Sequence, residues 1–354
     1  MTSRREVLGN MVGAAAGIVF TSCGLGHHAH AQAPVKRREI MVNGKRVRTV
    51  DAHAHCHVPE ALALMGLKET NQKLVIGEDR IAIMDAQGVD VEALSLNPIF
   101  WNKADHDQAA AVCKLQNEKL AEICAKTPDR FVGLASVALQ HPELAAQQLE
   151  DGVKRLGLRG TLVGGSVNGD DLSNPKFNPF WAKAEELGAV VFIHPQGTPE
   201  LQASGRLKGN GVLDNVIGNP LETTIALSHL IFDGTLDRYP GLKILAAHGG
   251  GYLPSYAARS DQGCLTFPAR CTPIKKKPTE YLKQMYYDSM VFTSEGLRHL
   301  IAEVGVSQIV MGTDYPFPWT STSCDHILNT PGLSDSDRAA MLGDNAVRLL
   351  GIKT

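Results

Sequence analysis

Residues 188–195 read Gly-Ala-Val-Val-Phe-Ile-His-Pro, and this short stretch contains the pattern that decides the fold. A glycine that can end a helix is followed by a continuous apolar run of strand length, and the run ends in a histidine. A strand that is apolar on both faces is typical of a parallel sheet covered by helices, because neither face meets water. The same succession of signals recurs along the chain.

Seven further apolar runs of strand length alternate with segments of helical spacing. The eight predicted strands are Val47–Ala54, Val91–Leu96, Phe131–Leu139, Gly160–Gly164, Ala189–His194, Lys243–His248, Met285–Met290 and Gln308–Thr313. The predicted helices are Asp79–Gln87, Asp107–Ala125, Glu143–Leu156, Asn178–Leu187, Leu221–Leu236, Ser294–Val304 and Ser334–Leu350. Eight such units over about 300 residues predict a single α/β domain, a (β/α)8 TIM barrel, rather than an open doubly wound sheet.

The composition excludes several classes of protein. The 354 residues include 35 Lys+Arg and 37 Asp+Glu, so a basic protein that binds nucleic acid through its phosphates is excluded. The body of the chain has no run of about 18 apolar residues, so we expect no integral membrane span. Seven cysteines are too few for a disulfide framework. Cys264 and Cys271 could pair after export, but we expect the cysteines of the mature chain to be free thiols.

The first 33 residues resemble an export signal. Arg4 and Arg5 precede a short, weakly apolar stretch, and an Ala-Gln-Ala cleavage site follows at 31–33. This pattern predicts a removable twin-arginine signal, a periplasmic location and a mature barrel domain over 34–354. Two alternatives stay open: a lipoprotein box in which Cys23 carries the lipid, and a frayed N-terminal helix.

Four residues suited to a divalent cation stand at the ends of three predicted strands. His53 and His55 end the first strand, His194 ends the fifth, and Asp314 follows the eighth. The carboxyl ends of barrel strands share one face, where active sites of this fold lie. Side chains at i and i+2 of a strand point the same way, with Cα atoms about 6.5–7 Å apart. We therefore predict that these four residues bind one metal ion and leave a position open for water.

The His-x-His pair is not specific by itself, because 13 histidines in 354 residues produce roughly half an occurrence by chance. Its place at a strand end, together with His194 and Asp314 at matching ends, carries the prediction. His248 precedes three glycines, which allow close backbone approach. We interpret it as an acid–base group beside the metal, because imidazole titrates near neutrality; a structural core histidine is the alternative. We expect Cys56 to point away from the metal.

Together these motifs resemble amidohydrolase family 2 of the metal-dependent amidohydrolase superfamily, and within it the branch typified by aminocarboxymuconate semialdehyde decarboxylase. The resemblance covers residues 47–351 and rests on Val50–His55, Ile193–Pro195, His248–Gly251 and Gly312–Pro318, with Arg80–Asp90 and Tyr286–Ser289 in agreement. It implies a barrel with one divalent ion, zinc first and manganese second. It also implies ligands His53, His55, His194 and Asp314, and catalytic roles for His248 and Asp314.

The resemblance also implies that Arg259, on the helix after the three glycines, reaches into a second subunit of a homodimer and holds a substrate carboxylate. A guanidinium suits that task because it can pair with both carboxylate oxygens; a surface arginine is the alternative. Two positions depart from the family pattern. Segment 58–77 contains Lys68 and Lys73 but no arginine, and Gln196 stands where an aromatic residue is usual. A lysine that could bridge two metals is missing from the end of the fourth strand.

The resulting hypothesis is nonoxidative decarboxylation of a small unsaturated or aromatic carboxylic acid, with His248 and Asp314 relaying a proton. Hydrolysis of a lactone, ester or amide by water activated at the same metal is the alternative, because it would use the same residues. A binding protein or inert relative that kept the barrel is a third possibility. We expect the long connections 197–220 and 266–278 to lie over the active face or at a subunit contact.

Overall fold

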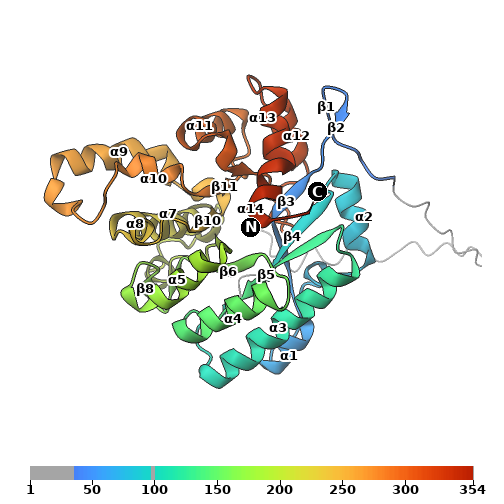
Figure 1. Cartoon of the computed structure of the whole chain (residues 1–354), viewed down its shortest axis with the longest axis horizontal. Helices are drawn as coiled ribbons and strands as arrows, with labels where there is room; N and C mark the ends of the chain where they lie inside the picture. Colours follow the sequence, from blue (N-terminus) through green and yellow to red (C-terminus); the bar gives the residue numbers. More distant parts are fainter. Residues whose placement is uncertain (1–35, 97–99, 354) are drawn as a thin grey trace, which may run out of the picture. The chain divides into compact units, whose positions relative to one another are not determined.

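The computed structural model describes residues 36–96 and 100–353, so the predicted signal and Cys23 lie outside the described residues. Eight parallel strands form one sheet in the order β3-β4-β5-β6-β9-β10-β11-β12 (Figure 1). Their bounds are β3 (Val50–Cys56), β4 (Val91–Leu96), β5 (Phe131–Ser136), β6 (Gly160–Val163), β9 (Val190–Ile193), β10 (Lys243–Ala246), β11 (Tyr286–Asp288) and β12 (Ile309–Val310). Each overlaps one predicted strand, and the predicted TIM barrel is confirmed.

Helices surround the strands and connect most of them (Figure 1). The longer ones are α2 (Glu78–Gln87), α3 (His106–Lys126), α4 (Pro142–Lys154), α5 (Asn178–Leu187), α7 (Asn219–Phe232), α9 (Leu253–Thr266) and α11 (Ser294–Val304). The shorter ones are α1 (Pro59–Leu64), α6 (Pro199–Ala203), α8 (Thr235–Arg238), α10 (Pro278–Leu282), α12 (Ser323–Asn329), α13 (Asp335–Ala339) and α14 (Asn345–Leu350). Among the longer helices, α9 was not predicted from apolar spacing; only the family resemblance implied a helix after the three glycines. It buries only Leu253, Pro254 and Ala257, all in its first half, so its apolar periodicity is weak.

Shorter elements complete the described part. One hairpin consists of β1 (Met41–Val42) and β2 (Lys45–Arg46), and the other of β7 (Ser166–Val167) and β8 (Asp170–Asp171). The short helical turns are η1 (Gln72–Leu74), η2 (Pro175–Phe177), η3 (Asp214–Gly218), η4 (His248–Gly250), η5 (Pro268–Arg270), η6 (Val306–Gln308) and η7 (Ala340–Asp344). The predicted helix 221–236 is interrupted, because Gly234 adopts a left-handed conformation between α7 and α8. The π-helical turn η7 likewise separates α13 from α14.

The barrel closes where the chain after β12 lies beside β3. The amide of Ala52 donates to the carbonyl of Met311 at 2.9 Å, and that of His55 donates to the carbonyl of Tyr315 at 2.7 Å. The Thr313 hydroxyl also donates to the buried Asp51 carboxylate. β12 is therefore shorter than predicted, because the chain beyond Val310 bonds to β3 through an irregular segment rather than through a regular ladder.

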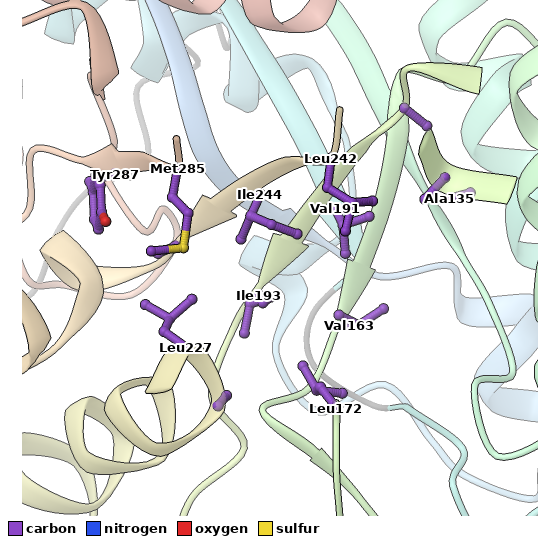
Figure 2. Close-up of a cluster of buried hydrophobic side chains, with 14 of the residues drawn as sticks. Ala135, Val163, Leu172, Val191, Ile193, Leu227, Leu242, Ile244, Met285 and Tyr287 are labelled. Carbon is purple, nitrogen blue, oxygen red and sulfur yellow. The ribbon is translucent and has the colours of Figure 1, made fainter. Parts of the chain in front are cut away.

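Apolar side chains cover both faces of the strands and form two layers, one inside the barrel and one between the strands and the helices. Val190 and Phe192 belong to the cluster inside the barrel, which Leu349 and Leu350 of α14 also join. Val191 and Ile193 belong to the larger cluster between strands and helices. Figure 2 shows part of this outer layer, in which side chains from β9, β10 and α7 gather. The alternation places His194, which follows Ile193, on the inner face.

One prediction about the cysteines was wrong. Cys264 and Cys271 form a disulfide that joins the end of α9 to the residue after η5. Cys56, Cys113, Cys124 and Cys324 are free, and Cys56 packs in the outer cluster, away from the metal ligands. Sequence spacing could not decide the pairing, because bond formation depends on how the chain turns between α9 and η5.

Within the described ranges, no helix is both long and apolar enough to cross a bilayer.

The packing of η7 against the chain that enters β3 can be tested at Gly343. A Cβ atom at Gly343 would lie 1.9 Å from the carbonyl oxygen of Arg48. Gly343→Ala should therefore lower the free energy of unfolding by roughly 1–3 kcal/mol and lower the thermal midpoint. Gly263→Ala in α9 is the matched control, because its Cβ would meet nothing within 4 Å. Equal midpoints for the two variants would contradict this packing.

Candidate metal centre and active site

Four predicted ligands converge at the carboxyl ends of the strands. One ligand atom each from His53, His55, His194 and Asp314 lies within 4.8 Å of the others, and all four residues are buried. Asp314 Oδ1 is 3.2 Å from His53 Nε2, 3.0 Å from His55 Nε2 and 4.0 Å from His194 Nε2. Three imidazole nitrogens and one carboxylate oxygen suit a divalent first-row metal ion.

A β-bulge turns the two histidines of β3 toward this point. Val50 and Ala52 lie inside the barrel, so strict alternation would send His53 and His55 outward. The register between β3 and β4 shifts between Asp51 and Ala54, and the shift reverses the alternation. The sequence predicted that the two side chains share a face, but not which face.

Each ligand histidine is oriented by its other ring nitrogen. His53 Nδ1 lies 2.6 Å from Asp288 Oδ2, and His194 Nδ1 lies 2.9 Å from the carbonyl oxygen of Pro195. His55 Nδ1 lies 2.9 Å from the hydroxyl oxygen of Ser95, which itself donates to the carbonyl of Ala54. Nδ1 of each ring is therefore held by a hydrogen-bond partner, and Nε2 is the atom that faces the shared centre; in His53, Nε2 must lose a proton before it can bind a metal.

The buried polar atoms at this centre fit a bound cation. Among the residues that the structure describes, His194 Nε2 and Asp314 Oδ1 are buried without a hydrogen-bond partner. Unpartnered buried polar atoms are rare in folded proteins, and a coordinated ion satisfies them. The imidazole nitrogens and the carboxylate oxygen point at a common position.

The protonation equilibria follow from burial and charge. Burial lowers the pKa of His55 to about 4 and holds that of His194 well below its usual range, so both rings are neutral at pH 7. Burial also acts to lower the pKa of His53, but Asp314 and Asp288 outweigh it and raise the value to about 10. Burial acts to raise the pKa of Asp314, yet the surrounding imidazoles hold it far below its usual range. A metal ion therefore competes with one proton, on His53.

Asp288 connects the metal centre to the loop of His248. Oδ2 of this buried carboxylate accepts from His53 and, at 2.8 Å, from the His248 amide, whereas Oδ1 accepts from the amides of Gly249 at 2.9 Å and Met290 at 3.1 Å. Burial acts to raise the pKa of Asp288, but the His53 hydrogen bond outweighs it and lowers the pKa. This aspartate lies in the Tyr286–Ser289 motif, which agrees with the family resemblance, but its role was not predicted from the sequence.

The turn after β10 requires glycine and fixes the direction of His248. His248 itself has φ +55°, and the next three residues, Gly249 to Gly251, also have positive φ. A Cβ on Gly251 would lie 2.2 Å from the carbonyl oxygen of Pro220, so this chain segment can approach only as glycine. His248 Nε2 lies 3.6 Å from Asp314 Oδ2, and the imidazole is partly exposed. This position places an imidazole, a group able to transfer protons, beside the four converging side chains.

A second buried pair, also missed by the sequence analysis, lies behind His55. Arg80 Nε is 2.7 Å from Glu92 Oε2, and Arg80 Nη2 donates to the carbonyl of His55 at 3.2 Å. The same guanidinium lies 4.1 Å from the centre of the Tyr315 ring. Arg80 therefore connects the backbone of one ligand to the residue that follows another, Asp314.

A cavity of about 710 Å³ borders His248. It lies among η3, α7, α9, α11 and the loops after β11 and β12, and Tyr252, Phe292 and Trp319 contribute rings to its wall. Connection 197–220 therefore lies partly over the active face, as expected, through Asn215 and Asn219. Connection 266–278 lines a different hollow, on the far part of α9.

Other predicted or overlooked residues lie around this site. Arg259 is exposed on α9 and makes no ion pair or side-chain hydrogen bond with the rest of the described chain. Lys68 and Lys73 are exposed. Glu222, which the sequence analysis overlooked, accepts from the amides of Gln196 at 2.6 Å and Gly197 at 2.7 Å, and so fixes the loop after His194. Burial raises the pKa of Glu222 to about 7.

The role of Asp288 predicts the effect of Asp288→Asn on metal affinity. An asparagine has one accepting oxygen and cannot serve four donors, so the orientation of His53 is weakened. Affinity for Zn²⁺ or Mn²⁺ should fall by roughly 10–100-fold, as measured by chelator competition. His194→Ala, which removes a ligand, should bind no stoichiometric metal. Near-UV circular dichroism checks folding, and an affinity within twofold of the wild type would contradict the assignment.

The pKa of His53 predicts how metal affinity depends on pH. Because His53 stays protonated up to about pH 10 while His55 and His194 are neutral, binding displaces one proton. The apparent association constant should therefore rise about tenfold per pH unit between pH 6.5 and 8.5. A chelator titration at three pH values measures this slope. A slope of zero, or of two or more, would refute the proton count.

Comparisons with known proteins agree with this geometry. The sequence profile of the amidohydrolase family, Amidohydro_2, matches residues 50–352. The chain is 31% identical to the 2-amino-3-carboxymuconate-6-semialdehyde decarboxylase of Dictyostelium discoideum over 93% of this chain and 84% of that protein. It is 32% identical to the gamma-resorcylate decarboxylase of a Rhizobium species, with 80% and 89% covered.

A solved structure shares the fold and contains a metal. The dihydroxybenzoic acid decarboxylase of a Polaromonas species, with bound manganese and the inhibitor 2-nitroresorcinol, has a TM-score of 0.74 and 28% identity. The alignment covers 86% of this chain and 97% of that one. The chain belongs to the amidohydrolase family.

Proposed function

We propose that this protein is a metal-dependent nonoxidative decarboxylase of a small aromatic or unsaturated carboxylic acid. The carrying observation is the three-histidine, one-aspartate centre, with His248 3.6 Å from the aspartate and beside a cavity. Relatives at 31% and 32% identity over most of the chain, both decarboxylases, support this assignment over hydrolysis.

The residues of the site perform the proton chemistry. A bound divalent cation would supply orientation of the acid and stabilisation of the negative charge that develops as CO₂ leaves. The carbon–carbon bond breaks, its electron pair stays on the substrate carbon, and that carbon gains a proton. His248 is placed to deliver this proton, and Asp314 Oδ2 stabilises the imidazolium before transfer.

The donor set and two solved relatives support the choice of metal and the class of acid. The donor set suits zinc, and the manganese in the Polaromonas relative supports manganese as the second candidate. The 2,6-dihydroxybenzoate that is bound in another relative, at 27% identity and TM-score 0.75, supports an aromatic acid. The proposed small-molecule partner is therefore a small carboxylic acid.

A homodimer would give Arg259 a role. Arg259 is exposed on α9, three residues after the exposed Tyr256 of the same helix face, and Tyr252, which directly precedes α9, is also exposed. Exposed aromatic residues beside an unpaired arginine are enriched at subunit interfaces. In this proposal Arg259 of the second copy holds the carboxylate that leaves. Arg259→Met should then raise the KM of the acid.

Export through the twin-arginine pathway to the periplasm is the proposed location, with residues 1–33 as the removed signal. The Cys264–Cys271 disulfide supports it, because disulfides persist in oxidising compartments and are rare in the cytosol. Lipidation of Cys23 stays the alternative form of this proposal, and mass spectrometry of the mature protein distinguishes the two.

The proposed reaction predicts CO₂ release by purified protein loaded with Zn²⁺ or Mn²⁺. With 2,6-dihydroxybenzoate and a panel of related aromatic and muconate-type acids, at least one acid should release CO₂. In D₂O the product should carry deuterium at the carbon that lost the carboxylate. His248→Asn should keep one metal per chain but lower kcat by roughly 10²–10⁴-fold, because the proton donor is lost.

His106→Asn is the control for that variant, because His106 is an exposed residue of α3 outside the site. Its kcat should equal that of the wild type. Hydrolysis of lactones without CO₂ release from any acid would contradict the proposed function and favour a hydrolase. Failure of the pure protein to retain metal would favour an inert relative.

A further inference from the structure

The cavity beside His248 shows what kind of molecule the site accepts. Among the residues that the structure describes, its wall contains no lysine, arginine, aspartate or glutamate. The titratable groups that line it are His248, His299 and Tyr252, and the remaining side chains are apolar, aromatic or neutral polar. The cavity therefore offers a largely uncharged environment next to a strongly charged metal centre.

We propose that the substrate has a single carboxylate, the one that leaves, on an otherwise neutral aromatic body. This inference rests on the proposed decarboxylation and goes beyond it, because the relatives include decarboxylases of different acids. The leaving carboxylate belongs at the metal end, where the cation and the proposed Arg259 of a second copy are its partners. The rest of the molecule then occupies the cavity.

A second carboxylate would meet no lysine or arginine side chain among the described residues that line the cavity. Moving a carboxylate from water into a site without an opposite charge is costly, so it is excluded or becomes protonated. The site thus selects by the cost that it imposes on a dianion as well as by its contacts with the preferred acid.

The neutral wall has the groups that a phenolic ring requires. The rings of Phe292, Trp319 and Tyr252 offer stacking surfaces, and Met290 and Leu300 add apolar area. The side-chain amides of Asn215 and Asn219 make no hydrogen bond with other described residues, so they are free to bind hydroxyl groups. The Tyr252 hydroxyl donates to the carbonyl of Val216 at 3.1 Å and keeps its oxygen as an acceptor.

The test compares three compounds on the metal-loaded wild-type protein. They are 2,6-dihydroxybenzoate, its 4-carboxylate derivative and the methyl ester of that 4-carboxyl group. The ester removes the charge of the second carboxylate and adds one methyl group, so a preference for it cannot come from a smaller size. We expect kcat/KM for the ester to be at least about tenfold higher than for the dicarboxylate.

A binding measurement separates this inference from the proposed function. In 2-nitroresorcinol a nitro group stands where the carboxylate of 2,6-dihydroxybenzoate would leave, so calorimetric binding of its para-carboxylate and para-ester derivatives needs no turnover. If the ester derivative binds more tightly but no acid releases CO₂, the selection of the cavity against a second carboxylate stands and the proposed function fails. If the dicarboxylate is turned over as well as the ester, the inference fails and the function stands. A preference for the dicarboxylate that Arg259→Met abolishes would also overturn it.

A substitution in the wall tests the charge argument directly. Val216 lies on η3, lines the cavity and is 40% exposed, so a longer side chain can be accommodated. Val216→Lys should raise kcat/KM for the dicarboxylate at least about fivefold relative to the ester. Val216→Met, of similar length without charge, is the control and should leave the ratio unchanged. Equal ratios in the two variants would overturn the proposal.

Discussion

The metal centre depends on how the barrel closes. The chain after β12 reaches β3 through hydrogen bonds from Ala52 to Met311 and from His55 to Tyr315, and by the Thr313–Asp51 contact. That closure brings Asp314 within 3.2 Å of both imidazoles of β3 although some 260 residues separate them in sequence. The bulge in β3 lies at the same place and turns the histidines inward. The contacts that close the barrel therefore also bring the metal ligands together.

Around this centre, buried groups outside the ligand set fix what the ligands do. Asp288 accepts four hydrogen bonds, one from His53 and three from backbone amides of neighbouring loops, so metal binding and the position of His248 depend on one carboxylate. The glycines after His248 permit the close approach to Pro220 that directs the loop toward the cavity. The uncharged cavity complements the metal centre in the proposed reaction. The substrate carboxylate lies at the metal, and neutral side chains contact the aromatic body.

Much of the fold and of the candidate site was predictable from local sequence. Apolar runs that end at or just before His55, His194 and Asp314 predicted both the strands and the metal ligands, because strand ends share one face of a barrel. The bulge, the roles of Asp288 and Glu222, and the Cys264–Cys271 pairing were not predictable. Each depends on which groups from distant parts of the chain meet in the folded protein. The sequence alone does not distinguish an aspartate that becomes buried from one that stays exposed. Arg259 stays a prediction, since its proposed partner is a second copy.

The most direct measurement is the anomalous scattering of a crystal grown with Mn²⁺. The account predicts one peak about 2.0–2.3 Å from Nε2 of His53, His55 and His194 and from a carboxylate oxygen of Asp314. The Nδ1 atoms should remain bonded to Asp288, Ser95 and the Pro195 carbonyl. A peak coordinated by His248, by a ligand Nδ1 atom, or by fewer than three of the four residues would contradict the account.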